Sequence, residues 1–183
     1  DERGAVQLII DTIMASDHPV TLICIGPLPD IGEALEREPR IVARARFVGM
    51  HGSIYGHGRR GAVRAREPNV RNHTTACQRV FRAAWDVTIT PLDTCGLIRL
   101  DGARYRAVRD CHSPLTRAVI ENYRLWVPHF CPPRGLTCDP DTASAGLCDT
   151  AAIYAAFSQD FLVMKTLGVH VTDAGYTIVD PAA

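Results

Sequence analysis

Three short apolar runs, separated by segments with helical periodicity, constrain the fold of this chain more than any other feature. The runs cover residues 20–25, 47–50 and 87–92. The first run is almost entirely apolar and stops at Gly26-Pro27, as expected for a parallel strand that is covered on both faces. The alternation of such strands with helices predicts an α/β fold with an open, mostly parallel sheet.

The segments between and after these runs have the periodicity of helices. Residues 5–16 place apolar side chains three to four positions apart, which indicates a helix with one buried stripe. We expect a helix with Asp30 as its N-cap over 31–38, and further helices over 74–85, 114–127 and 149–157. Near the end, residues 169–171 and 176–179 flank Asp173-Ala174-Gly175, which predicts a C-terminal β-hairpin.

The length and charge of the chain limit its class. Its 183 residues, 46% hydrophobic and 22% charged, are typical of one globular domain, which we place over residues 1–183. Twenty basic residues balance twenty acidic ones, so we expect neither a nucleic acid nor an anionic membrane surface as partner. The sequence contains no run of 18 or more apolar residues, so we expect no transmembrane helix.

Seven cysteines are present, an odd number with irregular spacing. This usage predicts free and mostly buried thiols and a cytoplasmic location. A zinc site is the alternative, but the spacing of its candidate ligands fits no common zinc module. Those ligands are His129, Cys131, Cys138 and Cys148.

Ligands of an open parallel sheet bind at the carboxyl ends of its strands. One such end is followed by a long segment, 51–72, rich in Gly, Arg and His, and connections of that length are usually functional or mobile. We interpret its arginines as a solvated surface, with a phosphate site as the alternative, because overall neutrality weakens their field. They are Arg59, Arg60, Arg64, Arg66 and Arg71.

Five segments at these strand ends resemble the nucleoside hydrolase family, whose inosine–uridine-preferring members cleave the N-glycosidic bond of ribonucleosides. They resemble, in order, a strand of the family with its Gly-x-Leu turn, the family's VxMGG strand end, its Glu-aromatic-Asn motif, the end of its next strand, and the start of the helix that carries its last calcium-ligating aspartate. In this chain the segments are 21–28, 47–52, 67–69, 90–94 and 147–151.

The resemblance implies a site for Ca²⁺ and a ribonucleoside. It implies that Asp149 is a carboxylate ligand of the ion and that Ile25 offers its backbone carbonyl. It also implies that the ribose is lined by three residues, Met50, Glu67 and Asn69. In the implied reaction a calcium-activated water attacks the anomeric carbon through an oxocarbenium-like state.

Cys148 stands where some family members have the histidine that protonates the leaving base, so it is the candidate acid, although a thiol suits that task poorly. Three other positions depart from the family pattern: Pro68 replaces an aromatic residue, His51 replaces a glycine, and Pro29-Asp30 replaces Thr-Asn. The preferred base cannot be predicted from these residues.

The family's DxDxxxDD turn, which carries its remaining calcium carboxylates, does not occur in these 183 residues. We therefore interpret the chain as the C-terminal part of the family's domain, with a sheet that is incomplete on its N-terminal side and has an exposed apolar edge. One carboxylate and one carbonyl fall short of the six to eight oxygens that Ca²⁺ takes, so we expect no useful metal affinity and no catalysis in this form.

Other interpretations of the same residues stay open. Without the family, Asp149 is an ordinary helix N-cap, and Glu67 and Asn69 are solvated loop residues. The alternative function is a degenerate, catalytically dead member that acts as a binding or interaction module, and either form could be a homo-oligomer. An unrelated nucleotide-binding α/β protein is disfavoured, because it would need a glycine-rich phosphate loop and GxxxxGK[ST] is absent.

Overall fold

The computed structural model describes residues 4–56 and 65–180. These residues form two compact units. The sheet unit contains the described residues up to Gly96 and those from Cys148 onward, and the helical unit is Leu97–Leu147. The helical unit is therefore an insertion in the sequence of the sheet unit. The expectation of one domain over 1–183 stays a prediction.

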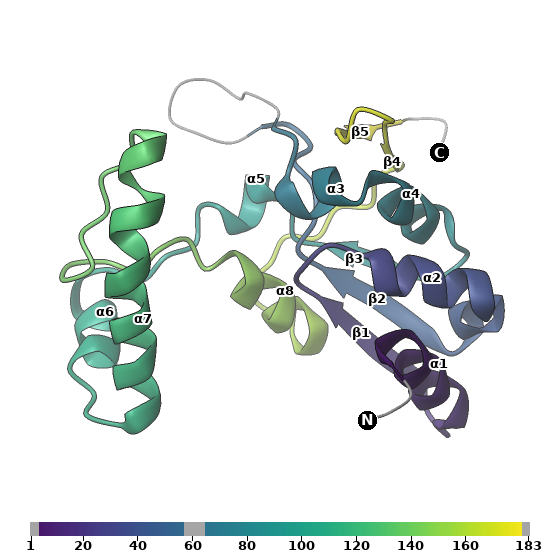
Figure 1. Ribbon diagram of the computed structural model, residues 1–183, viewed down its shortest axis with the longest axis horizontal. Coiled ribbons are helices and arrows are strands. Elements are labelled where there is room, and N and C mark those ends of the chain that lie inside the picture. The colour runs from purple at the N-terminus through teal and green to yellow at the C-terminus, as the bar shows by residue number, and fades with distance from the viewer. Residues whose placement is uncertain (1–3, 57–64, 181–183) are drawn as a thin grey trace. The chain divides into compact units, whose positions relative to one another are not determined.

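The sheet unit alternates helices and strands, as the apolar runs predict (Figure 1). Up to the insertion its elements are α1 (Ala5–Ala15), β1 (Val20–Cys24), α2 (Pro29–Arg37), η1 (Pro39–Ala43), β2 (Ala45–Gly49), α3 (Pro68–Asn72), α4 (Thr74–Arg82), β3 (Val87–Ile89) and α5 (Leu92–Cys95). After the insertion they are α8 (Cys148–Phe157), β4 (Val169–Val171) and β5 (Thr177–Val179).

The first three strands form one parallel sheet in the order β1-β2-β3. Val20 pairs with Ala45 at one end of the β1–β2 ladder and Cys24 pairs with Gly49 at the other. β1 lies at an edge of this sheet, and its Ile23 side chain is 44% exposed. The prediction of an α/β fold with a parallel sheet is confirmed.

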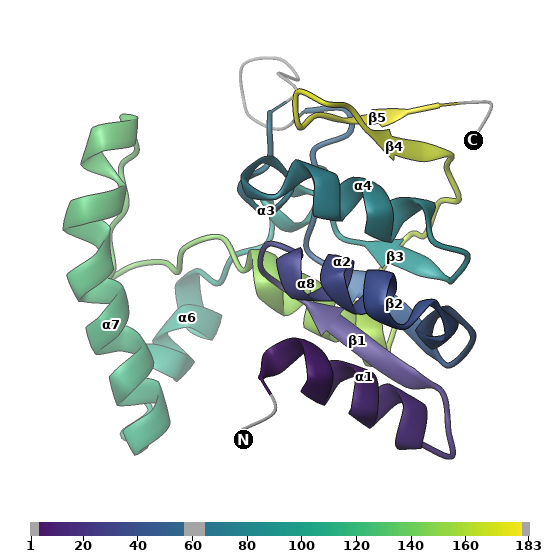
Figure 2. The same cartoon turned by 45° about the vertical axis from the view of Figure 1, so that its right-hand side comes forward.

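Neighbouring residues of β2 serve the two faces of the sheet, because strand side chains alternate in direction. Phe47 belongs to the large core that β1 and β2 form with α1, α2 and α4. Val48 packs instead against Ala155 and Ala156 of α8. Figure 2 shows the same arrangement, with α2 on one side of the strands and α8 on the other.

The last two strands form a separate antiparallel hairpin, which confirms the second part of the fold prediction. Gly175 in its turn has a φ of 79° and therefore occupies the conformation that favours glycine. β4 packs against α4, where the Gln78 side chain donates hydrogen bonds to the Val171 carbonyl at 3.1 Å and to the Asp173 carboxylate at 2.9 Å.

The helical unit consists of α6 (Gly102–Arg109), α7 (Pro114–Phe130) and η2 (Pro132–Arg134). α7 begins as predicted, with Pro114 in the first turn and with the Ser113 hydroxyl accepting a hydrogen bond from the Thr116 N–H at 3.1 Å. In the described parts of the chain, no helix is long and apolar enough to cross a membrane.

Two sequence-based expectations are wrong. Cys131 and Cys138 are joined by a disulfide, with their Cα atoms 6.2 Å apart, so these two thiols are not free and cannot ligate zinc. Disulfides are rare in reducing compartments, which weakens the reason for expecting a cytoplasmic location.

Asp30 is not the N-cap of α2: Pro29 already lies in the first turn, since its fixed φ suits that place, and Leu28 is the cap residue.

Candidate active site

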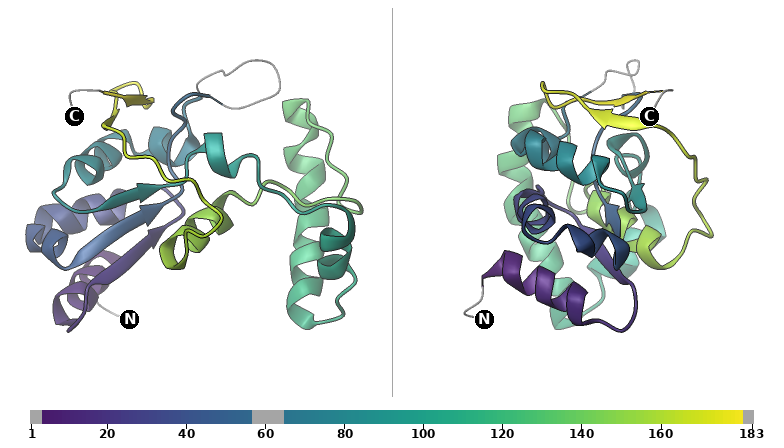
Figure 3. Two further views of the ribbon diagram at one scale, coloured as in Figure 1. Left: turned by 180° about the vertical axis from the view of Figure 1, so that it is seen from behind. Right: turned by 90° about the vertical axis from the view of Figure 1, so that its right-hand side faces the viewer.

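The carboxyl ends of the three parallel strands are tied together by backbone hydrogen bonds that continue past the ladders. The Met50 N–H donates to the Cys24 carbonyl at 3.0 Å, and the Leu92 N–H donates to the Gly52 carbonyl at 2.9 Å. Ile25 follows β1 directly. α8 contacts both β1 and β2, and Figure 3 shows it beside the arrowhead ends of these strands. This rim therefore collects segments that are distant in the sequence.

Glu67 is buried at this rim and serves as the N-cap of α3. Its carboxylate accepts three backbone hydrogen bonds, from Asn69 at 2.8 Å, Val70 at 3.0 Å and Gly52 at 3.2 Å. Burial raises the pKa of this carboxyl above its usual value, against the opposing effect of the three N–H groups. Glu67 therefore joins the loop after β2 to α3, in contrast to the interpretation of a solvated loop residue.

Asn69 connects the same helix to the end of β2. Its side-chain amide donates to the Met50 carbonyl at 2.9 Å and lies 3.4 Å from the Met50 sulfur. The structure thus brings together the three residues predicted to line a ribose.

Met50 also contacts the start of α8. It forms a small apolar cluster with Cys95, Ala151 and Ala152, against which Cys148 packs. Asp149 lies in the first turn of α8. Much of its surface is exposed, but the part that is shielded from water raises the pKa of its carboxyl. The predicted residues Met50 and Cys148 therefore meet at one place, with Asp149 next along the chain.

Cys95 and Cys148 lie together in this cluster. The neighbouring Cys95 thiol lowers the pKa of Cys148, and the Cys148 thiol together with burial raises the pKa of Cys95. Sequence analysis missed Cys95. The available signal was its place shortly after the third apolar run, at a strand end.

Two further residues shape the rim and were not predicted to do so. The Asp93 carboxylate accepts hydrogen bonds from the backbone N–H groups of Ile54 and Tyr55, both at 2.7 Å. The buried His51 ring lies 3.0 Å, through Nε2, from the Gly26 carbonyl, and burial lowers its pKa to about 4, so the ring is neutral and donates this bond. His51 thereby fastens the end of β1 to the end of β2.

The donor set at the rim does not fit a calcium ion. Ca²⁺ takes six to eight oxygen ligands, and the Glu67 carboxylate is already engaged by backbone N–H groups. The oxygen donors that remain are Asp149 and carbonyls such as that of Ile25. The neighbouring side chains of Met50 and Cys148 offer sulfur, which Ca²⁺ does not favour. Among residues 4–56 and 65–180 no cluster of three or more His, Cys, Asp or Glu side chains could hold a metal ion.

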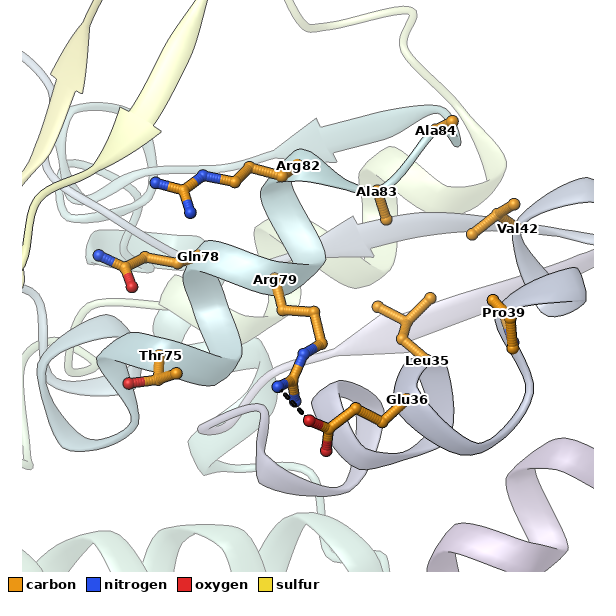
Figure 4. Close-up of a pocket in the computed structure, with 10 residues that line it drawn as sticks. All are labelled: Leu35, Glu36, Pro39, Val42, Thr75, Gln78, Arg79, Arg82, Ala83 and Ala84. Carbon is orange, nitrogen blue, oxygen red and sulfur yellow. Dashed lines mark hydrogen bonds and ion pairs between the residues drawn. The ribbon is translucent and has the colours of Figure 1, made fainter.

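A groove of about 570 Å³ lies elsewhere in the sheet unit, between α2, η1 and α4. Figure 4 shows the Arg79 side chain pointing to Glu36, with which it forms an ion pair, and Leu35 and Val42 are among the other residues that line the groove. This groove contains none of the predicted site residues, so its size gives no reason to move the candidate site away from the strand ends.

A glycine pattern in the sequence that follows β2 does not indicate a dinucleotide site. Residues 56–61 read GxGxxG, but the fingerprint requires a strand immediately before the glycines and a helix that they open. β2 ends at Gly49, and the next described helix begins at Pro68. His57, Arg59, Arg60 and Arg64 lie outside the described part of the chain.

Comparison with known proteins identifies the family. The family model described as "Inosine-uridine preferring nucleoside hydrolase" matches residues 1–183. The chain belongs to this nucleoside hydrolase family. An inosine-uridine preferring nucleoside hydrolase from Crithidia fasciculata is 39% identical over 94 residues, 51% of this chain and 29% of that protein. A pyrimidine-specific ribonucleoside hydrolase, RihB, from Escherichia coli is 41% identical over 58 residues, 32% of this chain and 18% of that protein.

Solved structures support the fold. A purine-preferring ribonucleoside hydrolase from Gardnerella vaginalis superposes with a TM-score of 0.76 at 23% identity, covering 100% of this chain and 57% of that one. A plant nucleoside hydrolase superposes with the same TM-score at 16% identity, covering 96% and 54%. The chain thus spans little more than half the length of these structures, and a smaller share of its curated relatives.

Proposed function

We propose that this chain provides the sugar-binding side of a nucleoside hydrolase pocket, which cleaves the N-glycosidic bond of a ribonucleoside to give ribose and a free base. One observation carries the proposal: the Asn69 amide is held against Met50 at the rim where α8 begins. Family membership supplies the reaction class.

The residues of the rim have distinct parts in this proposal. Glu67 fixes the first turn of α3, so the free side of the Asn69 amide is held in one orientation toward a sugar hydroxyl. Met50 provides an apolar contact for the ribose face. Cys148 is the candidate acid for the leaving base, since it lies beside Asp149 at the same rim. Preorganised contacts of this kind favour the flattened, cationic sugar of the transition state.

In this proposal a calcium ion binds only if residues outside the described donor set supply further ligands. Asp149 would contribute one carboxylate and Ile25 one carbonyl, and a bound ion would polarise the attacking water. We infer that the 183 residues alone do not hold the ion and do not turn over nucleosides.

The test is base release from inosine, uridine and cytidine, with and without added Ca²⁺. In a longer form of this protein that supplies further carboxylates, Asp149→Ala should lower base release by more than about 100-fold. Asp160→Ala, which removes an exposed acid beyond α8, should leave it unchanged. Equal effects of the two substitutions would contradict the role of Asp149.

The 183-residue chain gives the complementary test. Base release by this chain alone would contradict the inference that its donors are insufficient, although it would support the hydrolase reaction. A non-catalytic binding module is the second candidate, favoured by the incomplete donor set. It predicts calorimetric binding of inosine that Asn69→Ala weakens, and no base release from any longer form.

A further inference from the structure

The Cys95–Cys148 pair has a chemical capacity of its own. Cys95 is fully buried at the end of α5, and Cys148 is half-buried at the start of α8. α5 and α8 pack against each other, and both cysteine side chains belong to the small apolar cluster that contains Met50. Cys148 is therefore partly accessible to solvent, and Cys95 is buried in the same cluster.

None of the other five cysteines competes for this pairing. Cys24 packs against the large core of the sheet unit and does not belong to the Met50 cluster. Cys131 and Cys138 are already bonded to each other. Cys77 is buried against the Asn69 carbonyl, to which its thiol donates at 3.7 Å. Cys111 is exposed and belongs to the helical unit, whereas Cys95 and Cys148 both belong to the sheet unit.

The pair also stands at a special point of the chain. Cys95 lies just before the chain leaves the sheet unit at Gly96, and Cys148 is the first residue after it returns. A bond between them would close a loop around the whole helical unit. Cross-links that close long loops restrict the unfolded chain most strongly.

We propose that Cys95 and Cys148 form an oxidative modification site, at which a peroxide converts the two thiols into an intramolecular disulfide. The Cys148 sulfur attacks one oxygen of hydrogen peroxide and the O–O bond breaks, which gives a sulfenic acid and one water. The Cys95 sulfur then attacks the Cys148 sulfur and the S–O bond breaks, which releases a second water. Overall, two thiols and one hydrogen peroxide give one disulfide and two waters.

This disulfide would place a covalent bond next to Asp149 and would fix the end of α5 to the start of α8. The proposal does not depend on nucleoside hydrolysis, since its product is a bond that can be mapped in the protein itself.

The experiment uses the purified, folded 183-residue chain. It is treated with a few-fold excess of hydrogen peroxide, quenched with catalase, denatured, alkylated with iodoacetamide, and digested with trypsin and an aspartate-directed protease. Asp139 and Asp141 separate Cys138 from Cys148, so the two cysteines fall in different peptides. The expected product is a disulfide between peptides 93–99 and 141–148, detected by mass spectrometry without reduction.

Three controls make the result decisive. The Cys131–Cys138 link should be present with and without peroxide. Cys111→Ser should leave the new link unchanged, and Cys95→Ser should abolish it and leave Cys148 as a sulfenic or sulfinic acid. Recovery of both wild-type peptides in alkylated form, oxidation of Cys148 without a link, or the same link yield in urea would overturn the proposal. The wild-type map decides the matter even if a variant does not fold.

Discussion

The side-chain amide of Asn69 and the backbone carbonyl of Met50 are joined by a hydrogen bond of 2.9 Å. This bond holds the first turn of α3 against the end of β2, although the two residues are 19 positions apart in the sequence. The position of the proposed sugar contact therefore depends on this polar link.

Replacing Asn69 with alanine should destabilise the sheet unit. The Met50 carbonyl loses its donor, which costs about 1 kcal/mol in the free energy of unfolding. Urea denaturation followed by circular dichroism measures the change. Asn72→Ala is the matched control, since Asn72 is exposed in the same helix. Equal losses in the two variants would show that the loss comes from the helix and not from the link to β2.

Replacing Glu67 with alanine should cost more, about 2–3 kcal/mol, because three backbone N–H groups lose their acceptor. Glu67→Gln keeps one acceptor oxygen and removes the charge, so it should be destabilised less. The same urea denaturation, at constant pH, ranks the two variants, and a larger loss for glutamine than for alanine would contradict the capping role.

The stability of the wild type relative to Glu67→Gln should also depend on pH. Burial raises the pKa of Glu67, so the folded protein holds this proton more firmly than the unfolded chain. Its contribution is fully present below the usual glutamate pKa of about 4.3 and is lost as the pH rises through the folded pKa. Unfolding in urea from about pH 4 to 7 should therefore show the wild type losing stability relative to the variant. A relative gain would mean that the N–H groups outweigh burial.

Gly52→Ala should destabilise the rim. Gly52 has a φ of 88°, and an added Cβ would lie 2.8 Å from the Thr177 hydroxyl oxygen. Backbone strain and this contact together should cost about 1–3 kcal/mol. Gly26→Ala is the control, because a Cβ there meets nothing within 4 Å and φ is not positive. If thermal unfolding midpoints fall equally in both variants, the strain argument fails.

Replacing Cys131 and Cys138 with serine should lower the stability of the helical unit by roughly 2.5 kcal/mol, the chain-entropy value for so short a loop. Trp126 stacks on Phe130 in the same unit, so its fluorescence in a Trp85→Phe background reports this unfolding. Cys111→Ser, which removes an unbonded thiol of the same unit, should have little effect. An unchanged midpoint in the double variant would contradict stabilisation of the helical unit by the disulfide.

Millimolar Ca²⁺ should not raise the melting temperature of the 183-residue chain. A ligand at 100 times its dissociation constant stabilises a protein by about 2.7 kcal/mol, which a thermal melt detects easily. A clear upward shift with Ca²⁺, lost in Asp149→Ala, would show that the chain contains more oxygen ligands than the described residues provide.

The sequence predicted helices and strands well where the spacing of apolar residues matches the side chains that the fold buries. The apolar run from Val20 to Ile25 correctly predicts β1, although this strand lies at the sheet edge and Ile23 is 44% exposed, so it is not covered on both faces as expected. Gly175, with its positive φ, lies in the turn of the predicted hairpin. α6 was missed because its sequence is rich in arginine, and only Tyr105 of that helix is buried. Periodicity cannot reveal a helix that buries so little.

The site was predicted in part. Resemblance led to Met50, Asn69 and Cys148, and the structure brings these residues to one rim. The capping role of Glu67 and the partner of Cys148 were not predictable, because both depend on contacts between segments far apart in the sequence. The prediction of free thiols at Cys131 and Cys138 is wrong for a similar reason, because the spacing of cysteines in the sequence does not show which sulfur atoms meet in the fold.

The insertion between α5 and α8 has an evolutionary consequence. The chain leaves the sheet unit after Gly96 and returns at Cys148, and the helices on the two sides of the inserted segment, α5 and α8, pack against each other. A segment bounded by two adjoining points can be exchanged for one of another size without disturbing the strands. Residues 97–147 can therefore change in length and sequence during evolution without altering the rim that contains Met50 and Asn69.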